Sequence, residues 1–265
     1  MVVGLQRVCN MDLELLGKKV LITGASQGIG KATAFRFLEE GADLIIVSRG
    51  LDQLNALTEK LIKNYGENRI VSSVCDCTNE GDLASLKLLI KKKFGGIDVV
   101  VANVGDGNSV DDAIPSFDQW SKTWNSNFES ALLTARTFLN MLKISKGNLL
   151  FVSSIAGIEA FGAPVDYSTA KAAIIALAKN MSRKLTDVRV NVIAPGNVYF
   201  KGGAWDKKIK KDKDLIDKII KENVPMNRFA SPKEIADSIV FLCSGRASFI
   251  TGSTLVVDGG QTVGD

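Results

Sequence analysis

Histidine is absent from the sequence, which removes the side chain that most often exchanges protons near neutral pH. Any proton chemistry must therefore use tyrosine, lysine, cysteine or a carboxylate. Cysteine is scarce: Cys9, Cys75, Cys77 and Cys243 form neither a C-x-x-C pair nor a dense framework. Without histidine partners this pattern argues against a zinc site. We predict free thiols and no metal.

Long apolar runs are also missing, since none approaches the ~18–20 residues that a membrane-spanning helix needs. The first ten residues lack the apolar segment of a secretory signal. The formal charge of +4 is modest, and no basic stripe is interleaved with aromatic residues, which argues against nucleic acid as a partner. These absences predict a cytoplasmic protein that binds neither membrane nor nucleic acid.

The chain has 265 residues, 46% of them hydrophobic and 23% charged, which suits a globular protein with a large core. Met11 begins MDLELLGKKVLITG, which resembles a natural start, so we predict that residues 1–10 are a disordered extension, with a misassigned start as the alternative. No linker, repeat or low-complexity tract divides the remainder. We predict a single domain over residues 11–265.

A glycine-rich turn, TGASQGIG at 23–30, stands between an apolar strand at 19–23 and an amphipathic helix at 31–40. Glycines let the backbone approach a pyrophosphate, and the helix N-terminus attracts its charge. The spacing is G-x-x-x-G-x-G rather than the G-x-G-x-x-G of the usual dinucleotide fingerprint. Three glycines also fit a mere turn, but the strand before and the helix after favour nucleotide binding.

The next strand, at 43–47, ends at Ser48 and Arg49. In βαβ units an acid at this place binds the ribose 2′-OH of NAD, whereas an arginine accommodates the 2′-phosphate of NADP. Ser48 stands where the acid would be. Arg49 therefore favours NADP(H), although a solvated surface arginine is the ordinary alternative and NAD(H) stays possible.

Strands and helices alternate along the rest of the chain, which predicts a parallel sheet covered on both faces. We expect further strands at 69–75, 98–102, 149–152, 188–194 and 254–257, and helices at 52–64, 80–94, 117–143, 165–185 and 232–244. Ligands of such sheets bind beyond the carboxyl ends of the strands. Six residues stand at these strand ends, where a ligand is expected: Gly24, Ser48, Asp76, Asn103, Ser154 and Pro195.

Tyr167 and Lys171 share one face of the helix expected at 165–185, because positions i and i+4 are neighbours. An ammonium beside a phenol favours the phenolate and lowers a pKa that starts at about 10. Ser154 stands thirteen residues before the tyrosine. These residues alone fit either a proton-transfer site or an ordinary helix that carries one tyrosine and one lysine.

Residues 199–224 interrupt the alternation with aromatics, glycines and a lysine-rich amphipathic helix. Long segments after a strand end are commonly lids or substrate loops, and we predict that role here. The charge run fits a solvated helix face better than a polyanion site.

Together these motifs resemble the short-chain dehydrogenase/reductase (SDR) family, from about Leu16 to Gly260. The matching pieces are TGASQGIG at 23–30, Asp76, NVG at 103–105, Asn127, Ser154, YSTAK at 167–171, RVNVIAPG at 189–196, RFASPKEIA at 228–236 and ITGSTLVVDGG at 250–260. The resemblance implies a Rossmann-type, doubly wound α/β fold with seven parallel strands. It also implies a homotetramer or homodimer that is similar to 3-oxoacyl-ACP reductases.

The resemblance assigns catalytic roles. Tyr167 is the general acid in carbonyl reduction or the base in alcohol oxidation, and Ser154 donates a hydrogen bond to the substrate oxygen. Lys171 lowers the pKa of the tyrosine and binds the nicotinamide ribose, and Asn127 holds a water of a proton relay. Ser153 is the alternative to Ser154, but the spacing to Tyr167 favours the latter.

The resemblance also implies contacts with the cofactor, made by residues near the strand ends, and a substrate loop. Gly24, Ser26, Gln27, Gly28, Ile29 and Gly30 surround the diphosphate; Ser48 and Arg49 meet the adenosine ribose; Asp76 and Cys77 meet the adenine; Asn103 and Gly105 line the ribose; Tyr167, Lys171, Pro195, Gly196 and Val198 lie near the nicotinamide; Tyr199, Phe200 and Trp205 belong to the substrate loop.

Three positions depart from the family pattern. Val104 replaces the alanine of N-A-G, and Gln27 replaces a basic residue common in NADP(H)-binding members. The threonine expected after Pro195-Gly196 is missing, and Tyr199 and Phe200 stand there instead.

The predicted function is an NADP(H)-dependent interconversion of a ketone and a secondary alcohol, on either an oxoacyl thioester or a sugar or polyol. A dinucleotide-binding sensor without turnover is the alternative, but such a protein would be expected to lack the tyrosine or the lysine. An epimerase or dehydratase that uses transient oxidation is a third class, for which the chain has little room.

Overall fold

The computed structural model describes residues 11–107 and 109–264, so the extension predicted at residues 1–10 lies outside it. Seven parallel strands form one sheet in the order β3-β2-β1-β4-β5-β6-β7. The strands are β1 Lys19–Thr23, β2 Asp43–Ser48, β3 Ile70–Val74, β4 Val99–Ala102, β5 Asn148–Val152, β6 Arg189–Pro195 and β7 Thr254–Val257. The predicted seven-stranded, doubly wound sheet is confirmed.

The order reverses between β1 and β4, where the chain returns from one half of the sheet to begin the other. These two strands are paired in register, with Ile22 opposite Val101. Their β-branched and aliphatic side chains are fully buried, as expected of a sheet covered on both faces. A switch of this kind opens a crevice beyond the carboxyl ends of the strands.

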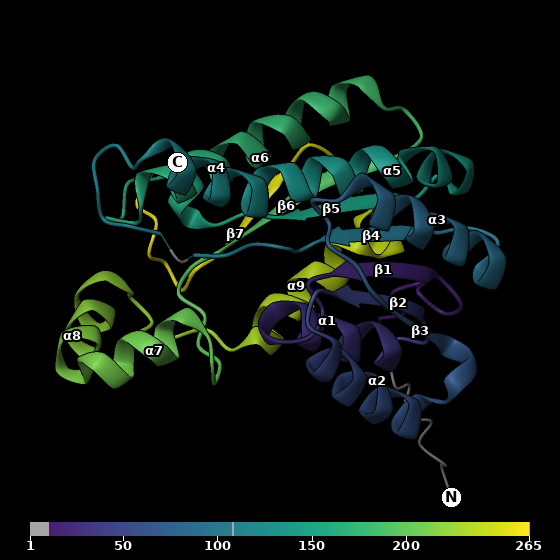
Figure 1. Cartoon of the computed structure of the whole chain (residues 1–265), viewed down its shortest axis with the longest axis horizontal. Coiled ribbons are helices and arrows are strands. Elements are labelled where there is room, and N and C mark those ends of the chain that lie inside the picture. The colour runs from purple at the N-terminus through teal and green to yellow at the C-terminus, as the bar shows by residue number, and fades with distance from the viewer. Residues whose placement is uncertain (1–10, 108, 265) are drawn as a thin grey trace, which may run out of the picture.

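Helices cover both faces of the sheet (Figure 1). One layer, below the sheet in this view, contains α1 Gly28–Glu39, α2 Leu51–Tyr65 and α9 Pro232–Cys243. The other contains α3 Glu80–Phe94, α5 Ser130–Ser145 and α6 Val165–Lys184. Among the described residues, none of these helices combines the length and apolar character needed to cross a membrane.

The long helix predicted at 117–143 is interrupted. It divides into α4 Phe117–Trp124, a π-helical turn Asn125–Glu129, and α5. Turns of π-helix are rare and occur frequently at functional sites. The interruption contains Asn127, one of the predicted catalytic residues.

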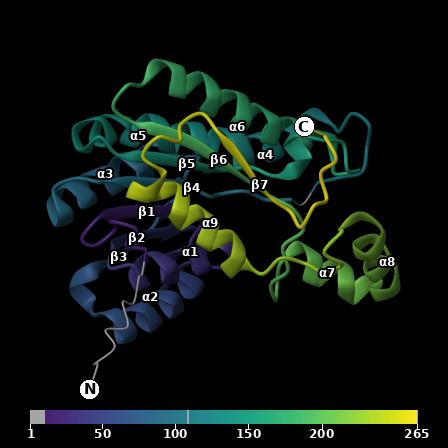
Figure 2. The same cartoon turned by 180° about the vertical axis from the view of Figure 1, so that it is seen from behind.

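The lysine-rich segment also forms two helices instead of one, α7 Ala204–Lys211 and α8 Lys213–Asn223. Asp212 separates them because its side chain accepts a hydrogen bond from the Leu215 backbone N–H and caps α8. Figures 1 and 2 both show this pair beyond the edge of the helix layers. Its small core contains the buried Ile216, Ile220 and Val224, with the lysines outside.

Candidate active site

A cavity of about 520 Å³ lies at the carboxyl ends of β1, β2 and β4, at the reversal of strand order. Most of the predicted cofactor residues line it: Gly24, Ser26, Gln27, Gly28, Ile29, Ser48, Arg49, Asp76, Cys77, Asn103, Gly105, Tyr167, Lys171 and Val198. Gly196 lines a neighbouring cavity instead, and neither cavity includes Gly30 or Pro195. Residues predicted from five strand ends are thus brought to one place.

The glycine turn brings α1 close to the strands. Gly24 and Gly28 have positive φ angles of 62° and 54°, which favour glycine. A side chain at Gly30 would come within 2.5 Å of the Gly24 carbonyl oxygen and 2.6 Å of the Asn103 amide, so Gly30 serves close packing. The first turn of α1 has neither a side-chain cap nor an acidic residue. Its N–H groups can therefore receive an anion.

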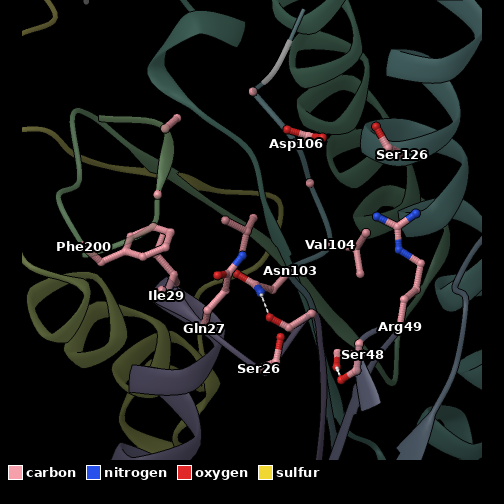
Figure 3. A pocket seen from close by; sticks show the side chains of 18 of the residues that line it. Ser26, Gln27, Ile29, Ser48, Arg49, Asn103, Val104, Asp106, Ser126 and Phe200 are labelled. Carbon is pink, nitrogen blue, oxygen red and sulfur yellow. Dashed lines mark hydrogen bonds between the residues drawn. The ribbon is translucent and has the colours of Figure 1, made fainter. Parts of the chain in front are cut away.

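The far end of the cavity is positively charged at Arg49, an exposed residue that points into it beside Val104 (Figure 3). Within residues 11–107 and 109–264, Arg49 forms no salt bridge. Burial tends to raise the pKa of nearby Asp76, but hydrogen bonds from Thr78 and the charge of Arg49 outweigh it and hold that pKa below its usual value. This end suits an added phosphate.

Cys75 and Cys77 line the same end, and the described cysteines are all free. The Cys77 thiol contacts that of Cys75, and this contact lowers the pKa of Cys75 and raises that of Cys77. The free-thiol prediction is thus confirmed for three of the four cysteines, and Cys9 lies outside the described residues.

Tyr167 and Lys171 project from the first turns of α6, as their spacing predicted. Tyr167 is partly exposed and lines the cavity, whereas Lys171 is only 3% exposed. The Lys171 ammonium lies 5.7 Å from the centre of the tyrosine ring and donates to the Val152 carbonyl over 3.2 Å. The Ser153 hydroxyl donates to the Lys171 carbonyl over 2.8 Å. Ser153 therefore ties β5 to α6.

The pKa expected for the tyrosine was wrong in direction. Burial raises the pKa of Tyr167, a hydrogen bond with Ser154 opposes the rise, and the charge of Asp106 adds to it. Burial also lowers the pKa of Lys171 to about 8. The i, i+4 spacing placed the two groups together but did not reveal the burial around them, which shifts both pKa values.

Asn127 lies fully buried behind these residues. Its side-chain amide donates to the carbonyls of Asp106 over 2.9 Å and Thr123 over 3.0 Å, and its oxygen accepts from the Asp106 N–H over 3.1 Å. A side chain at Gly105 would come within 2.9 Å of the Lys171 ammonium and 3.0 Å of the Asn127 oxygen. Gly105 thus lets the lysine and the asparagine approach each other.

A second cavity of about 510 Å³ opens on the other side of Tyr167. It contains Ser154 and shares Gly107, Tyr167, Ala204 and Trp205 with the first. Four polar residues that the sequence did not single out also line it: Asn197, Lys208, Asn223 and Gln261. They come from the segment after β6, α7, the end of α8 and the segment after β7, and carry no motif that could have indicated them.

The three predicted substrate-loop residues occupy different places in the structure. Trp205 lines both cavities, and Phe200 lines only the first. The Phe200 ring covers the glycine turn, since a side chain at Gly28 would come within 2.8 Å of it (Figure 3). Tyr199 lines neither cavity, and its hydroxyl donates to Asp206 over 3.0 Å. Tyr199 and Phe200 thus stand where the family pattern has a threonine.

The first cavity fits a dinucleotide. It has a cation at one end, a helix N-terminus and glycine turn in its middle, and a tyrosine–lysine pair at the other end. Glycine is needed in this lining, because a side chain at Gly105 would come within 2.9 Å of the Lys171 ammonium and one at Gly24 within 3.2 Å of the Asn103 amide. The second cavity then presents a small molecule to the same tyrosine.

Comparisons with known proteins agree with this geometry. The family model described as enoyl-(acyl carrier protein) reductase matches residues 24–262. The chain is 34% identical to glucose 1-dehydrogenase 2 of Bacillus subtilis over 260 residues, covering 96% of this chain and 98% of the relative. It is 30% identical to the 3-oxoacyl-[acyl-carrier-protein] reductase FabG of Aquifex aeolicus over 254 residues, covering 95% and 100%.

A solved structure of L-sorbose reductase from Gluconobacter frateurii, complexed with NADPH and L-sorbose, has the same fold. Its TM-score is 0.90 at 30% sequence identity, and the match covers 96% of this chain and all of that one. The chain belongs to the short-chain dehydrogenase/reductase family, whose members are NAD(P)-dependent oxidoreductases.

Proposed function

We propose that the protein is an NADP(H)-dependent oxidoreductase that interconverts a ketone and a secondary alcohol by hydride transfer. The observation that carries this proposal is the place of Tyr167, which lines both the dinucleotide-shaped cavity and the adjoining polar cavity. Arg49 at the far end supports NADP(H), and the NADPH complex of the similar sorbose reductase agrees with it.

The cofactor would be held along the first cavity by residues already described. The N–H groups at the start of α1 would receive the diphosphate, and Arg49 the 2′-phosphate. Phe200, whose ring lies against Gly28, would lie beside the diphosphate. NADP(H) supplies the hydride when bound there.

Side chains of the protein itself transfer the proton. Tyr167 donates it to the carbonyl oxygen in reduction, and its raised pKa keeps the phenol protonated at neutral pH. Ser154 donates a hydrogen bond to the same oxygen and stabilises its developing charge. Lys171, with a pKa lowered to about 8, can give up and regain a proton behind the tyrosine. Asn127 holds the Asp106 backbone beside it.

Residues 199–224 would act as the lid over both cavities, because Phe200 lines one and Lys208 the other. A cytoplasmic location and a homodimer or homotetramer stay predictions. The sensor without turnover is less favoured, because both Tyr167 and Lys171 are present and lie together.

Titration with NADPH and NADH, followed by a ketone panel with the preferred cofactor, tests the proposal. We expect tighter binding of NADPH, and we expect Tyr167→Phe to lower kcat by about 10²–10⁴-fold while cofactor binding persists. Tyr65→Phe is the matched control, since Tyr65, the last residue of α2, packs against Phe35 of α1 and lines neither cavity. Normal turnover by Tyr167→Phe would refute the mechanism, and equal affinity for the two cofactors would refute the role of Arg49.

A further inference from the structure

Three charged side chains are buried in the part of the chain that the structure describes: Asp166, Lys171 and Asp206. Lys171 belongs to the active site, and Asp206 is paired with Lys210. Asp166 is only 1% exposed and forms no salt bridge within residues 11–107 and 109–264. A buried carboxylate without a cation is costly unless hydrogen-bond donors surround it. Its donors therefore show what it holds.

Asp166 accepts hydrogen bonds at both of its oxygens. The Ser109 hydroxyl donates to Oδ2 over 2.5 Å, and the Tyr167 backbone N–H donates to Oδ1 over 2.8 Å. Burial tends to raise the pKa of Asp166, but hydrogen bonds, above all that from Ser109, outweigh it and hold this pKa below its usual value. The carboxylate is therefore ionised at neutral pH, and its bond to Ser109 is charge-assisted.

The bond between Ser109 and Asp166 joins two segments that line both cavities. Ser109 lies in the loop between β4 and α4, two residues after Gly107, and Asp166 directly precedes Tyr167 in the first turn of α6. Gly107 and Tyr167 are two of the four residues that the cavities share. The bond therefore sets how closely this loop approaches the tyrosine.

Helix α4 connects the same bond to Asn127. The Gln119 amide donates to the Ser109 hydroxyl over 3.1 Å and to the Thr123 hydroxyl over 3.0 Å. The Thr123 carbonyl accepts from Asn127, which also bonds to both backbone groups of Asp106. One network thus holds the loop at Asp106 and again at Ser109, between α4 and α6, which lie side by side (Figures 1 and 2).

We infer that Asp166 is a positioning residue, which holds the loop of Gly105 and Gly107 against the start of α6 so that this loop and Tyr167 keep one arrangement around the substrate carbonyl. The inference rests on the proposed function, because it assigns Asp166 to the reaction of Tyr167. Asp166 lines neither cavity, so it acts through Ser109 and not on substrate or cofactor. Small displacements of reacting groups can cost about 10²-fold in rate.

Two alanine variants remove the bond from its two sides. We expect Asp166→Ala and Ser109→Ala each to lower kcat about tenfold and to leave the dissociation constant for NADPH within about twofold, because the glycine turn and Arg49 are unchanged. The double variant should be no slower than Asp166→Ala, since both changes remove one bond. Ser109→Ala keeps the carboxylate and decides the question if Asp166→Ala does not fold. Asp112→Ala, which removes an exposed carboxylate from the same loop, is the control.

Asp166→Asn separates the bond from the charge. The asparagine oxygen can accept from the Tyr167 N–H while its amide donates to the Ser109 hydroxyl, so the connection between the loop and α6 survives. We expect this variant to keep kcat within about threefold of the wild type.

An ultraviolet titration reads the surroundings of Tyr167 without substrate. The chain has three tyrosines, so the difference between each protein and its Tyr167→Phe counterpart isolates this phenol. Burial raises the pKa of Tyr167, and we expect both alanine variants to lower that pKa toward its ordinary value, because a displaced loop admits water. The other charged groups near the phenol, Asp106 and Lys171, are present in every variant.

The outcomes separate this inference from the proposed function. Wild-type kcat with an unmoved phenol titration in both alanine variants overturns the inference while Tyr167-dependent turnover stands. Loss of kcat in Asp166→Ala without any effect of Ser109→Ala also overturns it, because the carboxylate would then act by its charge. Absence of turnover by the wild type with every ketone and cofactor overturns the proposed function, and the inference with it.

Discussion

Lys171 is a buried cation without an acidic partner. It is 3% exposed, and no described residue forms a salt bridge with it. Burial lowers its pKa from 10.5 to about 8, so the unfolded chain binds its proton more tightly. Stability therefore rises with pH between about 8 and 10.5, and below pH 8 the full destabilisation is present.

Replacing this lysine should stabilise the protein at neutral pH. Each pH unit in that window corresponds to about 1.4 kcal/mol, so Lys171→Met should raise the free energy of unfolding by up to about 3 kcal/mol more at pH 7 than at pH 10.5. Urea denaturation at the two pH values measures this difference. Lys184→Met, an exposed position at the end of the same helix, should show none. Equal effects of Lys171→Met at both pH values would contradict the prediction.

Single residues were predictable from the sequence where a motif or a strand end marked them. Tyr167, Ser154 and Arg49 reach the cavities that their positions indicated. The pKa of Tyr167 was not predictable, because it depends on burial that spacing cannot reveal. Gln261 carries no local pattern, and only the packing of the segment after β7 brings it to the second cavity.

The segment from Tyr199 to Asp206, which we call the strap, lies over the glycine turn. Asp206 is buried and holds it closed by accepting from the Tyr199 hydroxyl over 3.0 Å, the Gly202 N–H over 2.9 Å and the Lys210 ammonium over 2.7 Å. The bond from Lys210, with those from Gly202 and Tyr199, lowers the pKa of Asp206 to about 2. The carboxylate therefore stays ionised near neutral pH, and the strap stays bound.

Asp206→Ala should release the strap. We expect a several-fold higher dissociation constant for NADPH and faster tryptic cleavage at Lys201, because the strap would cover the glycine turn less of the time. Fluorescence titration and limited proteolysis measure the two effects. Asp217→Ala, which removes an exposed ion pair with Lys213 on α8, is the control. Cleavage as slow as in the wild type would show that Asp206 does not hold the strap.

Elements were predictable wherever apolar periodicity and turn residues agreed, which covers all seven strands and most helices. The break of the helix predicted at 117–143 was not predictable, because residues 117–143 contain no glycine or proline, and a π-helical turn needs neither. Asp212 is a helix-capping residue type that the sequence shows. The run of charged residues continues across it, however, so the boundary between α7 and α8 was not predicted.

At the scale of the whole molecule, β7 forms an edge of the sheet, and each of its residues is partly exposed. The neighbouring Phe249 is fully exposed. An uncovered edge with an aromatic side chain beside it is a surface suited to a second copy of the chain. We therefore place the expected homodimer contact here.

Phe249→Asp should weaken that contact, because a carboxylate would be buried against the second copy. Light scattering coupled to size exclusion should show a dimer or tetramer for the wild type and a smaller species for the variant. Leu88→Asp, at an exposed position on α3, should leave the mass unchanged. A wild-type monomer at all concentrations would contradict the prediction.

The two cavities share four residues, but the glycine turn and Arg49 line only the first, and α8 and the segment after β7 line only the second. Substitutions in α8 or after β7 can therefore change the accepted molecule without disturbing the glycine turn or Arg49. Residues around the second cavity can thus change during evolution while those around the first cavity are kept. On the proposed function, this separation fits relatives and a solved structure, 30–34% identical to the chain, whose names refer to glucose, sorbose and acyl-carrier substrates.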